Sequence, residues 1–213
     1  MLKILYEDDT LLVIEKPAGI DVEEIKRFLP KDATPAHRLD KDTSGILLVA
    51  KTKETLDFFH KQFKERKVEK KYVCLVEGSV KENEGKIETL LGRSPADKRK
   101  QKVFLAGQPL SAGKREAVSE YRVLERYKGY TLLEVRPRTG RKHQIRTHLA
   151  YLGHPVAGDK LYRFKNQKIP AGLNRQFLHA SRLKLQMPDG NIKEFESKLP
   201  GDLNLCLQQL KNL

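Results

Sequence analysis

The sequence has 213 residues, and its 42 Lys and Arg against 28 Asp and Glu give a net charge of +14. A chain of this length can fold as one domain without covalent cross-links, and two cysteines without paired spacing exclude a disulfide framework. The positive charge is typical of polyanion binding, although a solvated basic surface would give the same composition.

The predicted elements are mostly short strands bounded by turn signals. In chain order, the expected strands cover residues 2–6, 11–15, 46–51, 72–77, 86–91, 118–126, 131–136, 182–187 and 192–195. The acidic turn at residues 7–9, Lys128-Gly129 and Asp189-Gly190 are typical hairpin connections.

Helical spacing of apolar residues predicts helices over residues 54–66, 143–152 and 201–212, and one small helix within residues 20–36. Strands outnumber helices and do not alternate with them regularly. We therefore expect an α+β fold, with a mixed, largely antiparallel central sheet and flanking helices, in a single domain over residues 1–213.

No apolar stretch approaches the length of about 18 residues that a membrane span needs, and the N-terminus has no apolar signal region. We expect a cytoplasmic protein that does not contact a membrane, and a monomer is the default expectation.

An acid precedes the apolar strand at residues 46–51. The run His37-Arg38-Leu39-Asp40-Lys41-Asp42-Thr43-Ser44-Gly45 places Asp40 between an arginine and a turn. Loop side chains at the edge of a buried strand are held firmly enough to do chemistry, so Asp40 is the first candidate for a reactive group. Ser44 does not lie in the Gly-x-Ser-x-Gly turn of a hydrolase.

The second group of polar residues leads from Gly140 into a predicted helix. Arg141 and His143 stand at the helix N-terminus, where free backbone N–H groups favour an anion. Arg146 follows the apolar Ile145, so its guanidinium is expected near the sheet and needs a carboxylate partner. Asp40 is a natural candidate for that partner.

A metal site is disfavoured. His143, His148 and His154 are spaced by five and six residues, not by the four that place two imidazoles on one helical face. The basic segment at residues 93–102 reads as an exposed loop, and a solubilising role and a nucleic-acid contact are equally open for it.

Several motifs in family order resemble the RluA family of RNA pseudouridine synthases. They are His-Arg-Leu-Asp-x-x-Thr-Ser-Gly at 37–45, Gly-Arg-x-His-Gln-Ile-Arg-x-His-Leu at 140–149, Gly-His-Pro-x-x-Gly-Asp at 153–159, Lys-Pro-Ala-Gly at 16–19 and the Tyr72 strand at 70–78. The similarity runs from about residue 7 to about residue 200.

The resemblance implies a reaction that detaches uracil from its ribose, rotates the base and rejoins it through C5, without a metal or an organic cofactor. It assigns the catalytic carboxylate to Asp40 and places Tyr72 against the target base. Arg146 becomes the charge partner that keeps the carboxylate ionised. The carboxylate could attack the sugar, attack the base or remove a sugar proton, and these routes stay open.

A base within folded RNA must be extruded before a protein carboxylate can reach it. Arg38, two residues before Asp40, is expected to fill the vacated stack. The other expected RNA contacts, mainly to phosphate, are Lys16, Arg141, His143, Arg93, Lys98 and Arg99.

Because the sequence starts directly with the predicted catalytic hairpin, we expect a short member of this family without the N-terminal S4-type RNA-binding domain that many relatives carry. The expected substrate is ribosomal RNA or tRNA. The main alternative is a non-catalytic RNA-binding or ribosome-assembly module that has kept the fold. A metal-dependent nuclease would need clustered carboxylates, which the sequence does not show around Asp40 beyond Asp42.

Overall fold

The structure is a computed structural model that describes residues 2–107, 111–165 and 168–212. Its contacts divide the chain into two compact units. Unit 1 comprises the residues up to Tyr72 together with His179–Pro200, and unit 2 comprises Val73–Leu178 and the residues from Gly201 onward. Whether the chain acts as a single domain stays a prediction.

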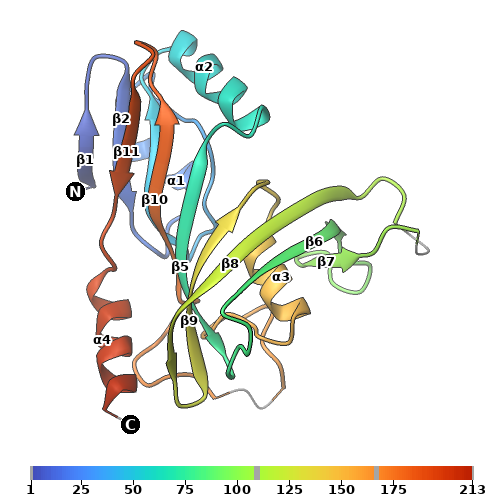
Figure 1. Ribbon diagram of the computed structural model, residues 1–213. Helices are drawn as coiled ribbons and strands as arrows, with labels where there is room; N and C mark the ends of the chain where they lie inside the picture. Colours follow the sequence, from blue (N-terminus) through green and yellow to red (C-terminus); the bar gives the residue numbers. More distant parts are fainter. Residues whose placement is uncertain (1, 108–110, 166–167, 213) are drawn as a thin grey trace. The chain divides into compact units, whose positions relative to one another are not determined.

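Unit 1 contains most of the N-terminal elements (Figure 1). They are β1 (Lys3–Glu7), β2 (Leu11–Lys16), α1 (Val22–Ile25), the 3-10 helix η1 (Lys26–Phe28), β3 (Thr34–Pro35), β4 (Ser44–Ala50), α2 (Lys53–Lys64), all but the first residue of β10 (Leu178–Gln186) and β11 (Ile192–Glu196). Its strand order is β1-β2-β4-β10, while β3 pairs with β4 and β11 with β10.

Unit 2 begins within β5 (Glu69–Glu77), which starts in unit 1. Its other elements are β6 (Glu84–Arg93), β7 (Gln101–Phe104), β8 (Arg115–Tyr127), β9 (Tyr130–Pro137), α3 (Gln144–Tyr151) and α4 (Gly201–Lys211). The strand order is β5-β9-β8-β6-β7.

The pairing is largely antiparallel in both units. The pairs β1/β2, β2/β4, β3/β4, β10/β11, β6/β7, β6/β8 and β8/β9 are antiparallel, whereas β4 and β10 run in parallel. The expected α+β fold with a mixed, largely antiparallel sheet and flanking helices is confirmed.

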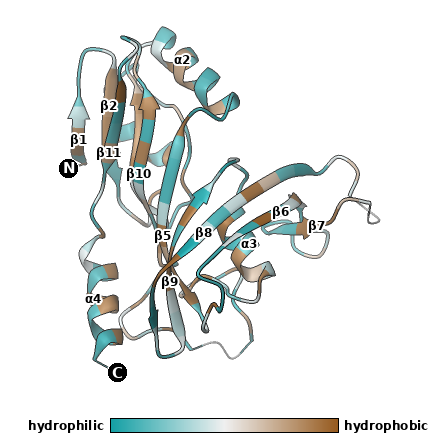
Figure 2. Ribbon diagram, in the orientation of Figure 1, coloured by the Kyte–Doolittle hydropathy of each residue, from teal (hydrophilic) through white to brown (hydrophobic). Residues whose placement is uncertain are grey.

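The central strands of unit 1 are buried on both faces. Leu11 and Val13 of β2 pack in one cluster with Phe59 of α2, whereas Leu12 and Ile14 pack in another with Ile25 of α1. Successive side chains of a strand point to opposite faces, so an uninterrupted apolar run can bury both. Figure 2 shows the hydrophobic colouring of β2. This rigid centre supports the loop that ends in β4.

The expected helices and strands are all present, with shifted ends. Two short strands, β3 and β7, were not predicted, because they are two and four residues long and carry no run of apolar residues. β5 begins at Glu69 rather than Tyr72, since backbone pairing extends it through charged residues with no hydrophobic signal. The basic segment is also no continuous loop, because its ends at Arg93 and Gln101 pair with each other in β6 and β7.

β4 and β10 come unusually close at Gly45. Gly45 pairs with Ala180 and has φ = +117°, and a Cβ added to it would lie 2.2 Å from the Ala180 carbonyl oxygen. Any side chain here would force the two strands apart immediately after the turn that contains Asp40.

We expect Gly45→Ala to lower the free energy of unfolding by roughly 3 kcal/mol or more, because backbone strain adds to a steric clash. The matched control is Gly19→Ala, where φ is +88° but no atom lies within 4 Å of the added Cβ. This variant should lose only the stability that backbone strain costs, about 1 to 2 kcal/mol. Urea unfolding measures both, and equal losses would show that the close approach of the strands does not matter.

Candidate active site

Asp40 lies at the start of a turn that leads directly into β4. The carbonyl oxygen of Asp40 accepts a hydrogen bond from the backbone N–H of Thr43 at 3.0 Å. Thr43 and Ser44 are buried, whereas Asp40 itself is half-buried. The backbone of the turn is thus fixed on the core side, while Asp40 as a residue stays partly exposed.

Lys16 stabilises this turn through hydrogen bonds of its buried side chain. Its side chain is fully buried, and Nζ donates to the carbonyl oxygens of Pro17 at 2.7 Å, Ile20 at 2.8 Å and Lys41 at 2.9 Å. An ammonium group has three donors, and all three are used here. The expectation that Lys16 contacts RNA phosphate is therefore wrong: the residue joins the loop after β2 to the turn that carries Asp40.

A chain of buried polar groups fixes the other end of the turn. Ser44 Oγ lies 3.0 Å from His179 Nδ1, and His179 Nε2 lies 3.1 Å from the Ser197 carbonyl oxygen. Because a carbonyl only accepts, His179 carries a proton on Nε2, and in the neutral ring Nδ1 then accepts a hydrogen bond from Ser44 Oγ. Ser44 is thus a structural residue that ties β4 to β10.

Tyr72, on β5, lies close to Asp40. Burial, together with the negative charge of Asp40, raises the pKa of the Tyr72 phenol well above its usual value. The hydroxyl group therefore stays protonated at neutral pH and can donate a hydrogen bond. The structure thus brings together two of the three predicted catalytic residues.

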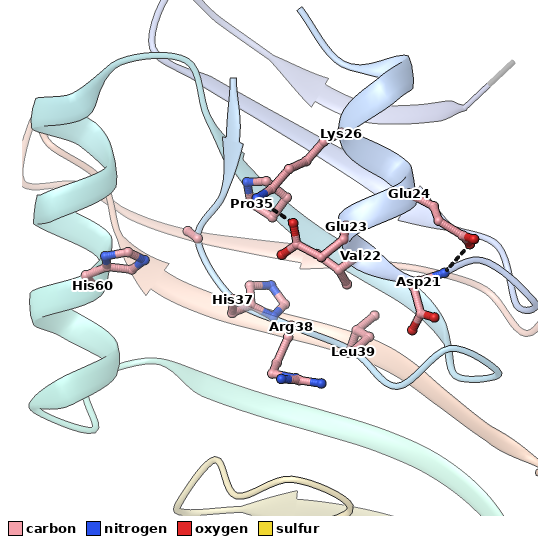
Figure 3. Close-up of a pocket in the computed structure, with 11 residues that line it drawn as sticks. Asp21, Val22, Glu23, Glu24, Lys26, Pro35, His37, Arg38, Leu39 and His60 are labelled. Atoms are coloured by element: carbon pink, nitrogen blue, oxygen red, sulfur yellow. Dashed lines mark hydrogen bonds and ion pairs between the residues drawn. The ribbon is translucent and has the colours of Figure 1, made fainter. Parts of the chain in front are cut away.

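Arg38 is exposed at the rim of a cavity of about 480 Å³. Figure 3 shows His37, Arg38 and Leu39 along one side of this cavity, His60 from α2, and Asp21 with its neighbours from α1. Leu39 is 5% exposed and belongs to the core, as the sequence indicated. Burial of Leu39 anchors the segment and leaves Arg38 directed away from the core.

Arg146, in unit 2, is 4% exposed and forms a bidentate ion pair with the buried Asp159, at 2.6 Å from Nε to Oδ2 and 2.9 Å from Nη2 to Oδ1. Its guanidinium also lies 5.1 Å from the ring centroid of Tyr162. The expected carboxylate partner exists, and Asp159 fills that role. An additional contact with Asp40 stays a prediction.

Asp159 is a site residue that the sequence reasoning missed. It is the last residue of the Gly-His-Pro-x-x-Gly-Asp motif, which was noted without a role. Asp159 Oδ1 also accepts hydrogen bonds from the backbone N–H groups of Leu161 and Tyr162. The sequence did offer a signal for Asp159. Arg146 was predicted to be buried and to need a carboxylate partner, and Asp159 lies only 13 residues further along the chain.

The start of α3 differs from the expectation. His143 precedes the helix with φ = +54°, in the left-handed region, and its Nδ1 lies 2.9 Å from the Tyr162 hydroxyl. Arg141 is half-buried, and its Nε donates to the Glu116 carbonyl oxygen at 2.9 Å. These bonds fix both side chains at the start of α3.

The basic residues of the β6–β7 connection are not equivalent. Arg93 and Lys98 are exposed. Arg99 is paired with Asp97, at 2.9 Å from Nη2 to Oδ2, and its side-chain and backbone hydrogen bonds lower the pKa of Asp97 to about 2. Arg99 therefore offers a partly neutralised charge.

Two further findings concern metal binding and membrane-spanning helices. Within residues 2–107, 111–165 and 168–212, no group of three or more His, Cys, Asp or Glu side chains could hold a metal ion. In the same described part of the chain, no helix is long and apolar enough to cross a membrane.

Comparisons with known proteins agree with these motifs. A family model described as RNA pseudouridylate synthase matches residues 10–151. The chain is 39% identical to ribosomal large subunit pseudouridine synthase D of Nitrosomonas europaea, covering 100% of this chain and 66% of the relative. It is 38% identical to ribosomal large subunit pseudouridine synthase C of Escherichia coli K12, covering 98% of this chain and 70% of the relative.

A solved structure has the same fold. Human RNA pseudouridylate synthase domain containing 1 superposes with a TM-score of 0.83 at 27% identity, covering 97% of this chain and 87% of that protein. The chain thus spans about two thirds of the two bacterial relatives and most of the human one.

We expect Lys16→Met to lower the free energy of unfolding by about 2 to 4 kcal/mol, because three backbone carbonyl groups lose the charged donor that joins them. Lys31→Met, at an exposed lysine of unit 1, removes the same charge and should change stability by less than about 0.5 kcal/mol. Urea denaturation distinguishes them. A neutral effect of Lys16→Met would contradict the structural role.

Proposed function

The chain belongs to the family of RNA pseudouridine synthases, which are isomerases acting on RNA, and we propose that it converts uridine to pseudouridine with Asp40 as the reacting carboxylate. The resemblance to the RluA family is confirmed by these relatives. The observation that supports Asp40 is its position: a half-buried carboxylate on a turn fixed from the core side, next to a phenol that stays protonated.

The reaction breaks the bond between N1 of uracil and C1′ of ribose, forms a bond from C5 to C1′, removes the proton of C5 and adds a proton to N1. The product is an isomer of the substrate with the same number of electrons and atoms, so no oxidant or reductant is needed. In each of the three possible roles of Asp40, the carboxylate must be ionised. Tyr72 remains neutral, so it stacks on the base and donates a hydrogen bond without adding a second negative charge.

We assign base extrusion to Arg38. Its exposed guanidinium stands two residues before Asp40, while Leu39 between them is anchored in the core. Extrusion costs a few kcal/mol in lost stacking and pairing. A planar cation that stacks in the vacated position recovers part of this cost while Asp40 faces the displaced nucleotide.

Phosphate contacts are assigned to basic residues that are exposed or half-buried. These are Arg93, Lys98, Arg141 and His143, with a smaller contribution from Arg99 because of its pairing with Asp97. Two relatives are named for the large ribosomal subunit, so its RNA is the first substrate to test, with tRNA as the second.

The alternative of a non-catalytic RNA-binding module makes a different prediction for Asp40. A carboxylate repels phosphate, so a module that only binds RNA has no use for an acid at this position. In a protein that only binds RNA, removing that charge would leave the RNA affinity unchanged or raise it slightly. A synthase would lose its reaction.

We expect Asp40→Asn to reduce pseudouridine formation at least about a thousandfold, because the amide cannot serve as the carboxylate. RNA affinity should change by less than about threefold, as the substitution keeps the shape of the side chain. Carbodiimide labelling and primer extension detect the product in ribosomal RNA and tRNA that lack the modification.

The matched control is Asp42→Asn, two residues further along the same segment. New stops with the wild-type protein and with Asp42→Asn, but not with Asp40→Asn, are the expected pattern. Retained activity of Asp40→Asn, or a parallel loss of RNA binding, would refute the assigned role.

We expect Arg38→Ala to slow modification of a stacked or paired uridine by roughly ten- to a hundredfold, which corresponds to a loss of about 1.4 to 2.8 kcal/mol. A uridine in an unstructured oligonucleotide should be affected much less, because it needs no extrusion. Arg27→Ala, at another exposed arginine of unit 1, is the charge-matched control. The same slowing on both kinds of RNA would indicate that Arg38 does not act in extrusion.

A further inference from the structure

Two lysine side chains of unit 2 lie on the same face of the sheet at Gly92, in β6. Gly92 pairs with Lys102 of β7, and residues directly opposite each other in paired strands project from one face. Lys114 directly precedes β8, and a Cβ added to Gly92 would lie 2.3 Å from Cδ of Lys114. The stem of Lys114 therefore occupies the space that the missing side chain of Gly92 leaves open.

Both ammonium groups lie over one aromatic ring. Phe104 stands two residues after Lys102 in β7, so it projects from the same face. Nζ of Lys102 lies 5.8 Å from the centroid of the Phe104 ring, and Nζ of Lys114 lies 5.1 Å from it. An ammonium group at such a distance is attracted by the electrons of the ring. Phe104 thus holds two positive charges near each other.

Positive charge prevails on this face. In the next row of the sheet, Leu90 pairs with Phe104 on one side and with Glu116 on the other. The two rows therefore carry two lysines and one glutamate. Like charges held near one ring repel each other, and an anion that approaches them relieves this repulsion.

The arrangement favours phosphate over a nucleobase. Phe104 is only 5% exposed, so its ring offers an RNA base no face for stacking. Lys102 is exposed and Lys114 is half-buried. Ammonium groups bind phosphate oxygens through charge-assisted hydrogen bonds, and an RNA strand carries one phosphate for each nucleotide.

We propose that Lys102 and Lys114 bind neighbouring backbone phosphates of the RNA, at a site that Gly92 and Phe104 shape. This inference rests on the proposed function, because it takes RNA as the substrate. Gly92 directly precedes Arg93, one of the residues with a proposed phosphate contact, so the site extends that contact across the strands β7, β6 and β8. Its role is in binding, not in the chemical step.

The variant Gly92→Ala tests the position of Lys114 separately from its charge. The added Cβ collides with the flexible stem of Lys114 and not with backbone, so we expect the stem to move while the net charge of the protein stays the same. Gly85→Ala is the matched control in the same strand. Its Cβ would lie 2.6 Å from the ring of Tyr121, so it displaces an aromatic side chain instead of a lysine.

The measurement is RNA affinity as a function of salt concentration. Each phosphate that a protein neutralises contributes about 0.7 to 0.9 to the slope of log affinity against log salt concentration. Binding is followed by fluorescence anisotropy with a labelled RNA hairpin that has uridines in its loop. Thermal unfolding of each variant verifies that it is folded.

We expect Lys102→Met and Lys114→Met each to lower the magnitude of that slope by about 0.7 to 0.9 and to weaken binding severalfold at moderate salt. Gly92→Ala should weaken binding about as much as Lys114→Met, although it removes no charge. Gly85→Ala should leave affinity and slope unchanged. Lys31→Met, at an exposed lysine of unit 1, should do the same.

An unchanged slope in both lysine variants would overturn the phosphate site. Unchanged affinity in Gly92→Ala would also overturn it, because the charge of Lys114 would then act regardless of its position, and so would an equal loss in Gly85→Ala. The proposed function is tested separately, by product formation with the wild-type protein. If no pseudouridine forms but the expected binding pattern appears, the phosphate site stands and the enzymatic assignment fails. If pseudouridine forms and these variants bind RNA like the wild-type protein, the reverse holds.

Discussion

A buried ammonium group holds the loop on which the proposed chemistry depends. Lys16 Nζ donates to three backbone carbonyl groups, and one of these belongs to Lys41, the residue after Asp40. A charge can be kept inside a protein only where its donors are satisfied, so the loop after β2 and the Asp40 turn must stay together. The close approach of Gly45 to Ala180 fixes the exit of the same turn.

The two catalytic candidates of unit 1 depend on this fixed backbone in different ways. Asp40 lies on a turn whose backbone is tied to the core, and the residue is half-buried. Tyr72 is placed by β5, and burial together with the nearby Asp40 carboxylate raises the pKa of its hydroxyl group. In unit 2, Asp159 holds Arg146 in a single orientation through two hydrogen bonds. Side chains that are held rigidly before the substrate binds lose little conformational entropy when it does.

The sequence predicted much of the fold because its strongest signals are local. The uninterrupted apolar runs at β2 and β4 and the helical spacing in α2 indicate buried elements directly. β3, β7 and the first residues of β5 carry no such signal. Backbone pairing with β4 makes β3 a strand, and pairing with β6 does the same for β7. Asp40 and Arg38 could be predicted as site residues because they stand in one contiguous run of the sequence. That Tyr72 lies near them could be predicted from the family motifs. The roles of Lys16 and Asp159 could not be predicted from either.

Sequence alone thus determined the family, the class of fold and the candidate carboxylate, because these depend on residue types and their spacing along the chain. Tertiary structure decided which charges are buried and with which partners. Lys16 and Lys102 are both lysines of a β-strand, yet the first is fully buried under the Asp40 turn and the second is exposed beside the Phe104 ring. The physical reason is that the sequence specifies which side chains carry a charge. Their exposure to water and their hydrogen-bond partners depend on segments far away in the chain.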